Sequence, residues 1–370
     1  MWKLGKRHAL LAAAVAVLAA AAVAAGLFLT DRRGHSKQTS APPLVKTRFA
    51  VFADSYARPR WAGLVLVDPA RRRCTNVPLP GSPSYMTFSG TRYVYSTGPK
   101  SYRLGRIGGP LPRRFRTKTR ELPYWLDGQV GLASAFSRRL RLAGRTVNLD
   151  VPRGAQVAGF VASHGRVAFQ AWWGDTREST NRTAIFLYVH GVQRRVAFPV
   201  PPRFAANPTE YDLLGWTPDG RRLVVQVHDN IWTAAPDGTH LKPLTHLAPT
   251  SAVYQGGNLL WSPDGRLLAF VGSRGDNRPP QTYVLRADGS RPVRQLTHTD
   301  RYPGPYGQQD GTVPLTWLGP HALAAAHQFW IGILRLDGSF RPLCRRDGVT
   351  FSNGTALPRG TSGAASRPSR

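Results

Sequence analysis

Short apolar runs alternate with turn-forming residues along most of the chain. The runs at 223–225 and 267–270 are typical, and each closely follows a Pro-Asp-Gly turn. An Asp-Gly pair supplies the positive φ that a tight hairpin needs. Short apolar runs bounded by such pairs are typical of strands. The pattern therefore predicts an all-β chain of short strands joined by tight turns.

A repeat organises these strands into units. Trp216-Thr217-Pro218-Asp219-Gly220 recurs as Trp261-Ser262-Pro263-Asp264-Gly265, and Leu244-Thr245-His246 recurs as Leu296-Thr297-His298. The unit at 258–298 reads as four strands, at about 258–262, 267–271, 281–286 and 292–297. Strands this short cannot bury both faces alone, whereas radial stacking of the sheets as blades leaves only short edges.

These residues resemble the TolB-type, WD40-like propeller repeat, whose core is W-S-P-D-G, an apolar strand, an aromatic strand ending in D-G, and L-T. The match is strong over 211–298 and fair over 313–344. The resemblance implies a β-propeller of about seven four-stranded blades over 46–355. Six blades is the alternative, because the unit near 120–150 is short. The family usually works as an envelope-facing docking surface.

The N-terminus has the pattern of a targeting segment. Residues 1–8 form a basic stub, and no charge interrupts the run from Ala9 to Leu29. About 20 apolar residues span a bilayer as a helix, so we expect a signal anchor at 9–30. Cleavage near Ala22-Val23-Ala24, giving a secreted protein, stays open. A polar linker at 31–45 and a tail at 356–370 would flank the propeller. We expect a single-pass cell-membrane protein with its propeller on the extracytoplasmic side.

The formal net charge of +30 has two explanations. One is Arg-rich codon usage, and the other is an anionic partner such as an acidic wall polymer. No run of Lys and Arg exceeds three residues, and no recognition helix is visible. We therefore expect no sequence-specific binding of nucleic acid.

Cys74 and Cys344 are too few for a disulfide framework or a zinc site. They fall in the predicted first and last blades, which are neighbours in a closed ring. An exported chain could pair them if their Cα atoms lie within about 7 Å. We favour two free, half-buried thiols over this disulfide.

Long, variable loops are expected on one face of the propeller, where the second strand of a blade connects to the third and where blades are linked. Loops held by a rigid scaffold often carry binding groups, and aromatic and Arg side chains often anchor interfaces. The candidate partner-binding residues on this face are Tyr56, Arg58, Arg60, Trp61, Trp172, Trp173, Arg177, Arg274, Arg278, Arg301, Tyr302 and Tyr306. The alternative is that Trp172 and Trp173 pack between blades and that the arginines are merely solvated.

The sequence favours a binding module over an enzyme. No nucleophile elbow, Walker loop, dinucleotide fingerprint or H-E-x-x-H motif is present. Turn chemistry accounts for the repeated aspartates, so we expect no metal, cofactor or catalytic residue. We expect a monomer that binds an envelope protein or an anionic wall polymer. The rival hypothesis is a propeller enzyme, a sugar or lactone hydrolase or lyase, with its site at the mouth of the central channel.

Overall fold

The computed structural model describes residues 46–54, 62–81, 83, 85–98, 100–117, 121–134, 137–142, 145–173, 182–198, 211–227, 230–246, 251–253, 259–274, 281–298, 311–327, 329–345 and 350–357. These residues form strands, turns and loops, and none of them belongs to a helix that could cross a membrane. The predicted stub, signal anchor and linker lie outside the described residues.

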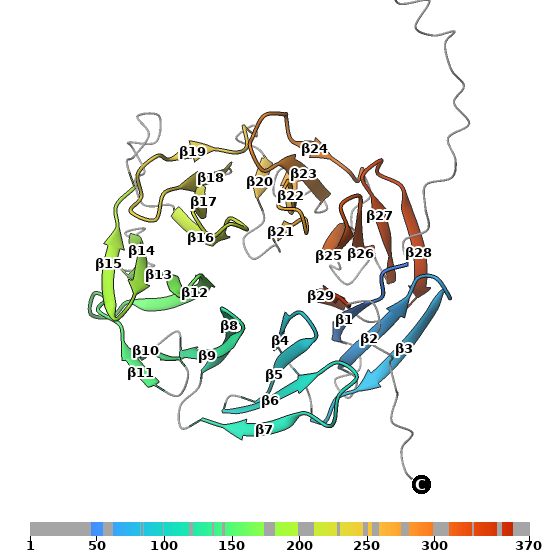
Figure 1. The fold of residues 1–370 in the computed structure, drawn as a ribbon, viewed down its shortest axis with the longest axis horizontal. Helices are drawn as coiled ribbons and strands as arrows, with labels where there is room; N and C mark the ends of the chain where they lie inside the picture. The colour runs from blue at the N-terminus through green and yellow to red at the C-terminus, as the bar shows by residue number, and fades with distance from the viewer. Residues whose placement is uncertain are drawn as a thin grey trace, which may run out of the picture. The chain divides into compact units, whose positions relative to one another are not determined.

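Seven sheets form the seven blades of a β-propeller, which settles the choice between six and seven. Figure 1 shows the sheets arranged radially, with one edge strand of each sheet nearest the centre. Blade 1 contains β29 (Thr350–Ala356), β1 (Phe49–Asp54), β2 (Gly63–Asp68) and β3 (Arg73–Pro78). Blade 2 contains β4 (Tyr85–Ser89), β5 (Arg92–Gly98), β6 (Ser101–Arg106) and β7 (Arg113–Arg116). Blade 3 contains β8 (Leu122–Leu126), β9 (Gln129–Ser134), β10 (Ser137–Leu142) and β11 (Arg145–Asn148).

The remaining four blades each follow the chain in order. Blade 4 contains β12 (Gln156–Ser163), β13 (Arg166–Trp173), β14 (Arg182–Val189) and β15 (Val192–Val196). Blade 5 contains β16 (Tyr211–Trp216), β17 (Leu223–Val227), β18 (Asn230–Ala234) and β19 (Lys242–Pro243). Blade 6 contains β20 (Ser251–Val253), β21 (Leu260–Trp261), β22 (Leu267–Arg274), β23 (Gln281–Arg286) and β24 (Arg294–Gln295), with β20 and β21 both pairing with β22. Blade 7 contains β25 (Thr312–Gly319), β26 (Ala322–His327), β27 (Trp330–Arg335) and β28 (Phe340–Arg345).

The ring closes because blade 1 is built from both ends of the propeller. The late strand β29 pairs antiparallel with β1 and supplies the innermost strand of that blade. Phe351 and Thr355 are buried there, and the amide of Leu357 donates to the carbonyl of Arg48 at 2.8 Å. The final strand ends at Ala356, one residue beyond the boundary expected from the sequence.

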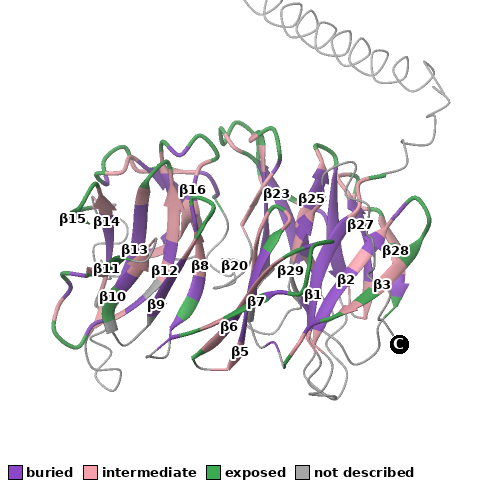
Figure 2. Cartoon of the chain, turned by 60° about the horizontal axis from the view of Figure 1, so that its bottom comes forward, coloured by how far each residue is buried: buried purple, intermediate pink, exposed green. Residues whose placement is uncertain are grey.

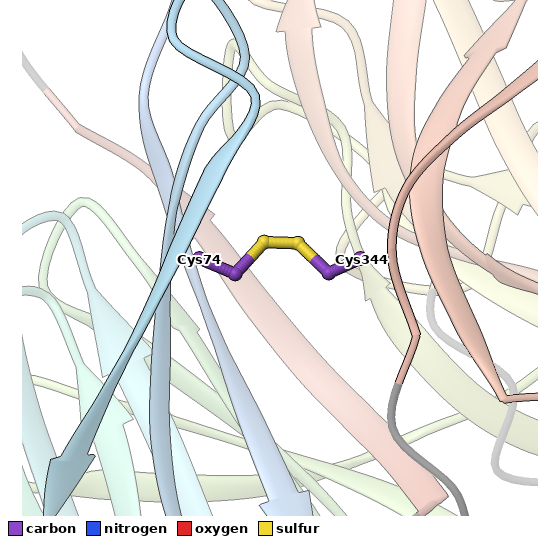
Figure 3. Close-up of a disulfide and its surroundings, with 2 residues drawn as sticks. All are labelled: Cys74 and Cys344. Atoms are coloured by element: carbon purple, nitrogen blue, oxygen red, sulfur yellow. A yellow bond between two sulfur atoms is a disulfide. The ribbon is translucent and has the colours of Figure 1, made fainter.

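A disulfide joins blades 1 and 7 at their outer edge. Cys74 on β3 and Cys344 on β28 are bonded, with their Cα atoms 6.3 Å apart (Figure 3). The expectation of two free thiols is therefore wrong. Ring closure brings the outermost strands of blades 1 and 7 into contact, which puts the two side chains within bonding reach.

The hydrophobic core lies between neighbouring blades. Six buried apolar clusters join blades 7 and 1, 1 and 2, 3 and 4, 4 and 5, 5 and 6, and 6 and 7. Figure 2 shows buried residues in the strands and exposed ones mainly in the turns and outer strands. No such cluster of described residues joins blades 2 and 3. There the Tyr102 hydroxyl donates to the carbonyl of Glu121 and accepts from its amide, so this joint is partly polar.

The strand order gives the propeller two different ends. The turn end carries the hairpin turns from the first to the second strand and from the third to the fourth, such as 164–165 and 190–191 in blade 4. The loop end carries the second-to-third connections and the links between blades. Because β1 begins at the turn end, residue 46 and residue 357 both lie there.

Candidate functional site

The predicted partner-binding face corresponds to the loop end. Most of its candidate residues lie outside the described residues, namely Tyr56, Arg58, Arg60, Trp61, Arg177, Arg278, Arg301, Tyr302 and Tyr306. The structure therefore does not test whether these side chains gather into one site, and the face remains a prediction.

Three candidates fall on described strands. Trp172 and Trp173 end β13 at the loop end, and both are half-buried. Trp173 packs against the apolar cluster between blades 3 and 4, and the Arg195 guanidinium lies 5.9 Å from its ring centre. Arg274 ends β22, where its backbone pairs with Ser251. For Trp173, the contacts fit the structural alternative of packing between blades.

The repeated aspartates are turn residues, as the sequence predicted. In blade 5 the Asp219 carboxylate accepts hydrogen bonds from the Thr217 hydroxyl at 2.6 Å and the Arg221 amide at 3.0 Å. The Thr217 hydroxyl, followed by the Arg221 amide, lowers the pKa of Asp219. A Ser or Thr hydroxyl, followed by a backbone amide, likewise lowers the pKa values of Asp237, Asp264, Asp288 and Asp337.

Tryptophan side chains of the innermost strands join successive blades. Each indole N–H donates to a backbone carbonyl in the innermost strand of the preceding blade, over 2.7 to 3.4 Å. The pairs are Trp125 with Thr87, Trp216 with Val161, Trp261 with Trp216, and Trp317 with Leu260. The tryptophan of the repeat is therefore a structural residue.

Arginine side chains reinforce two of these joints at the turn end. The Arg92 guanidinium lies 5.0 Å from the ring centre of Trp125, and its Nη1 donates to the carbonyl of Gly128 at 3.0 Å. Cation–π stacking and this hydrogen bond together fix the side chain on blade 3. An equivalent contact in the joint between blades 4 and 5 links Arg166 to Trp216 and to the carbonyl of Gly220.

Ser163 and His164 form a close hydroxyl–imidazole pair, with Oγ and Nδ1 2.8 Å apart. The two residues are consecutive in a turn, and His164 has a φ of 51°. Asp127, from the neighbouring turn of blade 3, accepts hydrogen bonds from the amides of His164 and Gly165. These contacts hold the turns of blades 3 and 4 together, which accounts for the cluster structurally.

The outer edge of blades 2 and 3 concentrates positive charge. We call the following residues the basic sector: Arg92, Lys100, Arg103, Arg106, Arg113, Arg114, Arg116, Arg138, Arg139, Arg141 and Arg145. Figure 1 places β7 and β11, the outermost strands of these blades, at the rim of the ring. Most of these side chains are exposed.

Acidic residues do little to neutralise the basic sector. The described residues of blades 2 and 3 include the acids Glu121 and Asp127. Glu121 is only 6% exposed, and the Asp127 carboxylate is bound to backbone amides of blade 4. Sequence inspection missed this sector because its arginines are scattered over several strands. Their density between residues 100 and 145 was the available signal.

No three His, Cys, Asp or Glu side chains of the described residues are grouped closely enough to hold a metal ion. The loops at the mouth of the channel, where the enzyme hypothesis places its site, lie largely outside those residues. The enzyme hypothesis therefore stays untested.

Comparison with known proteins supports the fold alone. No family model and no curated protein matches the sequence. The β-propeller domain of the Trilobed protease from Pyrococcus furiosus is 8% identical, with a TM-score of 0.53 over 81% of this chain and 95% of that one. A protein assigned as TolB from Agrobacterium tumefaciens is 16% identical, with a TM-score of 0.40 over 84% of this chain and 99% of that one. Porphyromonas gingivalis dipeptidyl peptidase 4 is 9% identical, with a TM-score of 0.41 over 78% of this chain and 57% of that one. The chain is thus a seven-bladed β-propeller, and its arrangement is consistent with the TolB-type repeat in its sequence.

Proposed function

We propose that the chain is an extracytoplasmic binding module for an anionic polymer of the cell envelope, and that the basic sector is its contact surface. The observation that carries this proposal is the exposed positive charge on the outer strands of blades 2 and 3, where the described acids Glu121 and Asp127 are buried and bound to backbone amides of blade 4, respectively. Clustered charge of one sign raises the local concentration of a polyanion and speeds its association. Arginine adds a planar fork that matches carboxylate and phosphate oxygens.

The extracytoplasmic location is supported by two features. The disulfide between Cys74 and Cys344 favours an oxidising compartment, since cytosolic thiols are kept reduced. The uncharged run from Ala9 to Leu29 has the length of a signal anchor. Under this proposal the run tethers the propeller to the membrane. The chain enters the propeller at the turn end.

The first test is co-sedimentation of the full chain with insoluble envelope polymer at about 0.1 M and about 0.3 M salt. The screening length falls from about 10 Å towards a few ångströms over this range, so purely diffuse attraction should fade. We expect binding at both salt concentrations for the native chain. Replacement of Arg114, Arg116, Arg139 and Arg145 by Ser should reduce the bound fraction severalfold.

A matched variant distinguishes binding through the basic sector from binding through the net charge of the chain. Arg71, Arg73, Arg286 and Arg291 are exposed arginines of blades 1 and 6, and their replacement by Ser removes the same charge elsewhere. This control should bind nearly as well as the native chain. Equal loss in both variants would mean that net charge does the binding and would reject the sector. Capture of a discrete protein that survives both sets of substitutions would instead favour protein docking at the loop end.

A further inference from the structure

A hollow of about 350 Å³ opens on blade 2, within the basic sector. The side chains that shape it are Arg92, Leu104, Arg106, Pro110, Leu111 and Arg113. Three of these residues are arginines and two are leucines, and most of the lining surface is apolar, so three arginine side chains border an apolar hollow. Leu111 is 83% exposed, so most of its apolar side chain faces solvent.

Strand register places the three guanidinium groups on one face of the sheet. Arg92 on β5 pairs directly with Arg106 on β6, and Leu104 on β6 pairs directly with Arg113 on β7. Directly paired residues project to the same side, as do residues two apart on one strand. The contact of Arg92 with Trp125 shows that this side faces blade 3.

This arrangement is costly without a counter-ion. Like charges directly opposite each other in a sheet are destabilising, and no carboxylate lines the hollow. The joint between blades 2 and 3 is also the one where the described residues form no apolar cluster. Apolar packing therefore does not explain why three arginines border the same hollow.

Two of the guanidinium groups are already held in position. Arg92 is fixed by Trp125 and by the carbonyl of Gly128, and the Nε of Arg106 donates to the Thr91 hydroxyl at 3.3 Å. A guanidinium has five N–H donors, so each retains donors for a ligand. Donors that are oriented before binding lose less freedom when the ligand arrives.

We propose that this hollow binds a phosphate-ester group, with the carbon chain of the ester resting on Leu104 and Leu111. The inference rests on the proposed function, because it names the chemical group of the anionic polymer that the sector would recognise. One arginine fork satisfies the two oxygens of a carboxylate. Three guanidinium groups from three strands suit a phosphate, whose oxygens point in several directions. A volume near 350 Å³ also has room for organic atoms beside the anion.

Titration calorimetry on the full chain in non-ionic detergent tests this site. The probes are phenyl phosphate and benzoate, which share an apolar ring and differ in the anion. Phenyl phosphate should bind about tenfold more tightly than benzoate, a difference of one charge-assisted hydrogen bond. Arg106→Ser combined with Arg113→Ser should weaken phenyl phosphate by about tenfold or more.

Two further variants make the result decisive. Arg71→Ser combined with Arg291→Ser removes the same charge from distant turns and should leave the affinity for phenyl phosphate within about twofold. Leu111→Ser should weaken phenyl phosphate while leaving inorganic phosphate unchanged. Equal affinity for the two probes, or equal loss in both arginine double variants, would overturn the site.

Failure of this site and failure of the proposed function give different results. The polymer assay replaces Arg114, Arg116, Arg139 and Arg145, none of which lines the hollow. Polymer binding without phenyl phosphate binding would reject the hollow and keep the function. Phenyl phosphate binding without polymer binding would reject the polymer and identify a small phosphorylated molecule as the ligand.

Discussion

The aspartates of the repeated turns are explained at the level of single hydrogen bonds. In blade 6 the Asp264 carboxylate accepts from the Ser262 hydroxyl at 2.6 Å and the Arg266 amide at 3.1 Å. The charged carboxylate is the better acceptor, so the Ser262 hydroxyl, and after it the Arg266 amide, lowers the pKa of Asp264. The turn and the charge of its aspartate are therefore coupled.

This coupling predicts a stability that depends on pH. A carboxyl whose pKa is lower in the folded than in the unfolded state stabilises the fold at pH values above its unfolded-state pKa. The ordinary value of 3.8 stands for that unfolded-state pKa. That contribution is lost as the pH falls through the lower, folded pKa. We expect the urea midpoint to fall as the pH is lowered below this ordinary value. Replacing Asp219, Asp237, Asp264, Asp288 and Asp337 by Asn should flatten this profile, because the amide oxygen keeps an acceptor without a charge.

Not every functional candidate could be read from single residues. Trp125-Leu126-Asp127-Gly128 is a reduced form of the repeat signature, and its Trp and Asp each contact a neighbouring blade. By contrast, the roles of Arg92 and Arg106 depend on strand register. Because a register shift of one residue moves a side chain to the opposite face, no inspection of separate residues brings these two together.

At the level of the elements, the short strand β29 is important because it closes the ring. Its sequence, TFSNGTA, is polar and lacks the repeat signature, yet it forms the innermost strand of blade 1. The Thr355 hydroxyl also donates to the carbonyl of Gly90 in blade 2 at 2.9 Å. The strand therefore joins three blades, since it also contacts β25 of blade 7.

Two truncated chains distinguish the contribution of β29 to stability from that of the residues that follow it. A chain ending at Asp347 loses β29 and should lose at least the 3–5 kcal/mol, roughly, that truncation of one core phenylalanine costs. A chain ending at Pro358 keeps β29 and should melt like the native protein. Thermal unfolding followed by circular dichroism measures both. Identical melting of the two truncated chains would mean that β29 is dispensable.

The repeat made the blades at 211–298 predictable, because Trp, Asp-Gly and Leu-Thr recur at fixed places in both units, whereas only the Trp and one Asp-Gly mark the unit at 313–344. Blade 3, at 122–148, carries few of these marks, and only the pairing of β8 to β11 establishes it as a separate blade. The closing strand was not predictable from local sequence. Its partner β1 lies almost the whole length of the propeller away, and its own residues carry no periodic apolar signal.

At the level of the whole molecule, the ring is closed twice between blades 7 and 1. The backbone closes it at the centre through β29, and the disulfide closes it at the rim through β3 and β28. A cross-link between residues so far apart in sequence removes many conformations from the unfolded chain. The joint between blades 7 and 1 is thus held both by a strand pairing and by a covalent bond.

Reduction should weaken the fold without destroying it. We expect the free energy of unfolding to fall by about 2–4 kcal/mol when Cys74 and Cys344 are both replaced by Ser. Urea titration with and without reductant checks this value. The native chain should respond to reductant, and the double Ser variant should not. Titratable thiols in the native, non-reduced protein would contradict the bond.

Closure at one seam also determines how the propeller would respond to mechanical load. Arg48 and Leu357 are hydrogen-bonded neighbours on antiparallel strands. Tension applied through the flanking segments would therefore peel β29 from β1 one bond at a time, rather than shear all of their bonds at once. Unravelling from either end would then stop at Cys74 and Cys344, whose covalent bond carries the load past the blades in between. A stretched molecule would thus release two short segments and keep most of its ring intact.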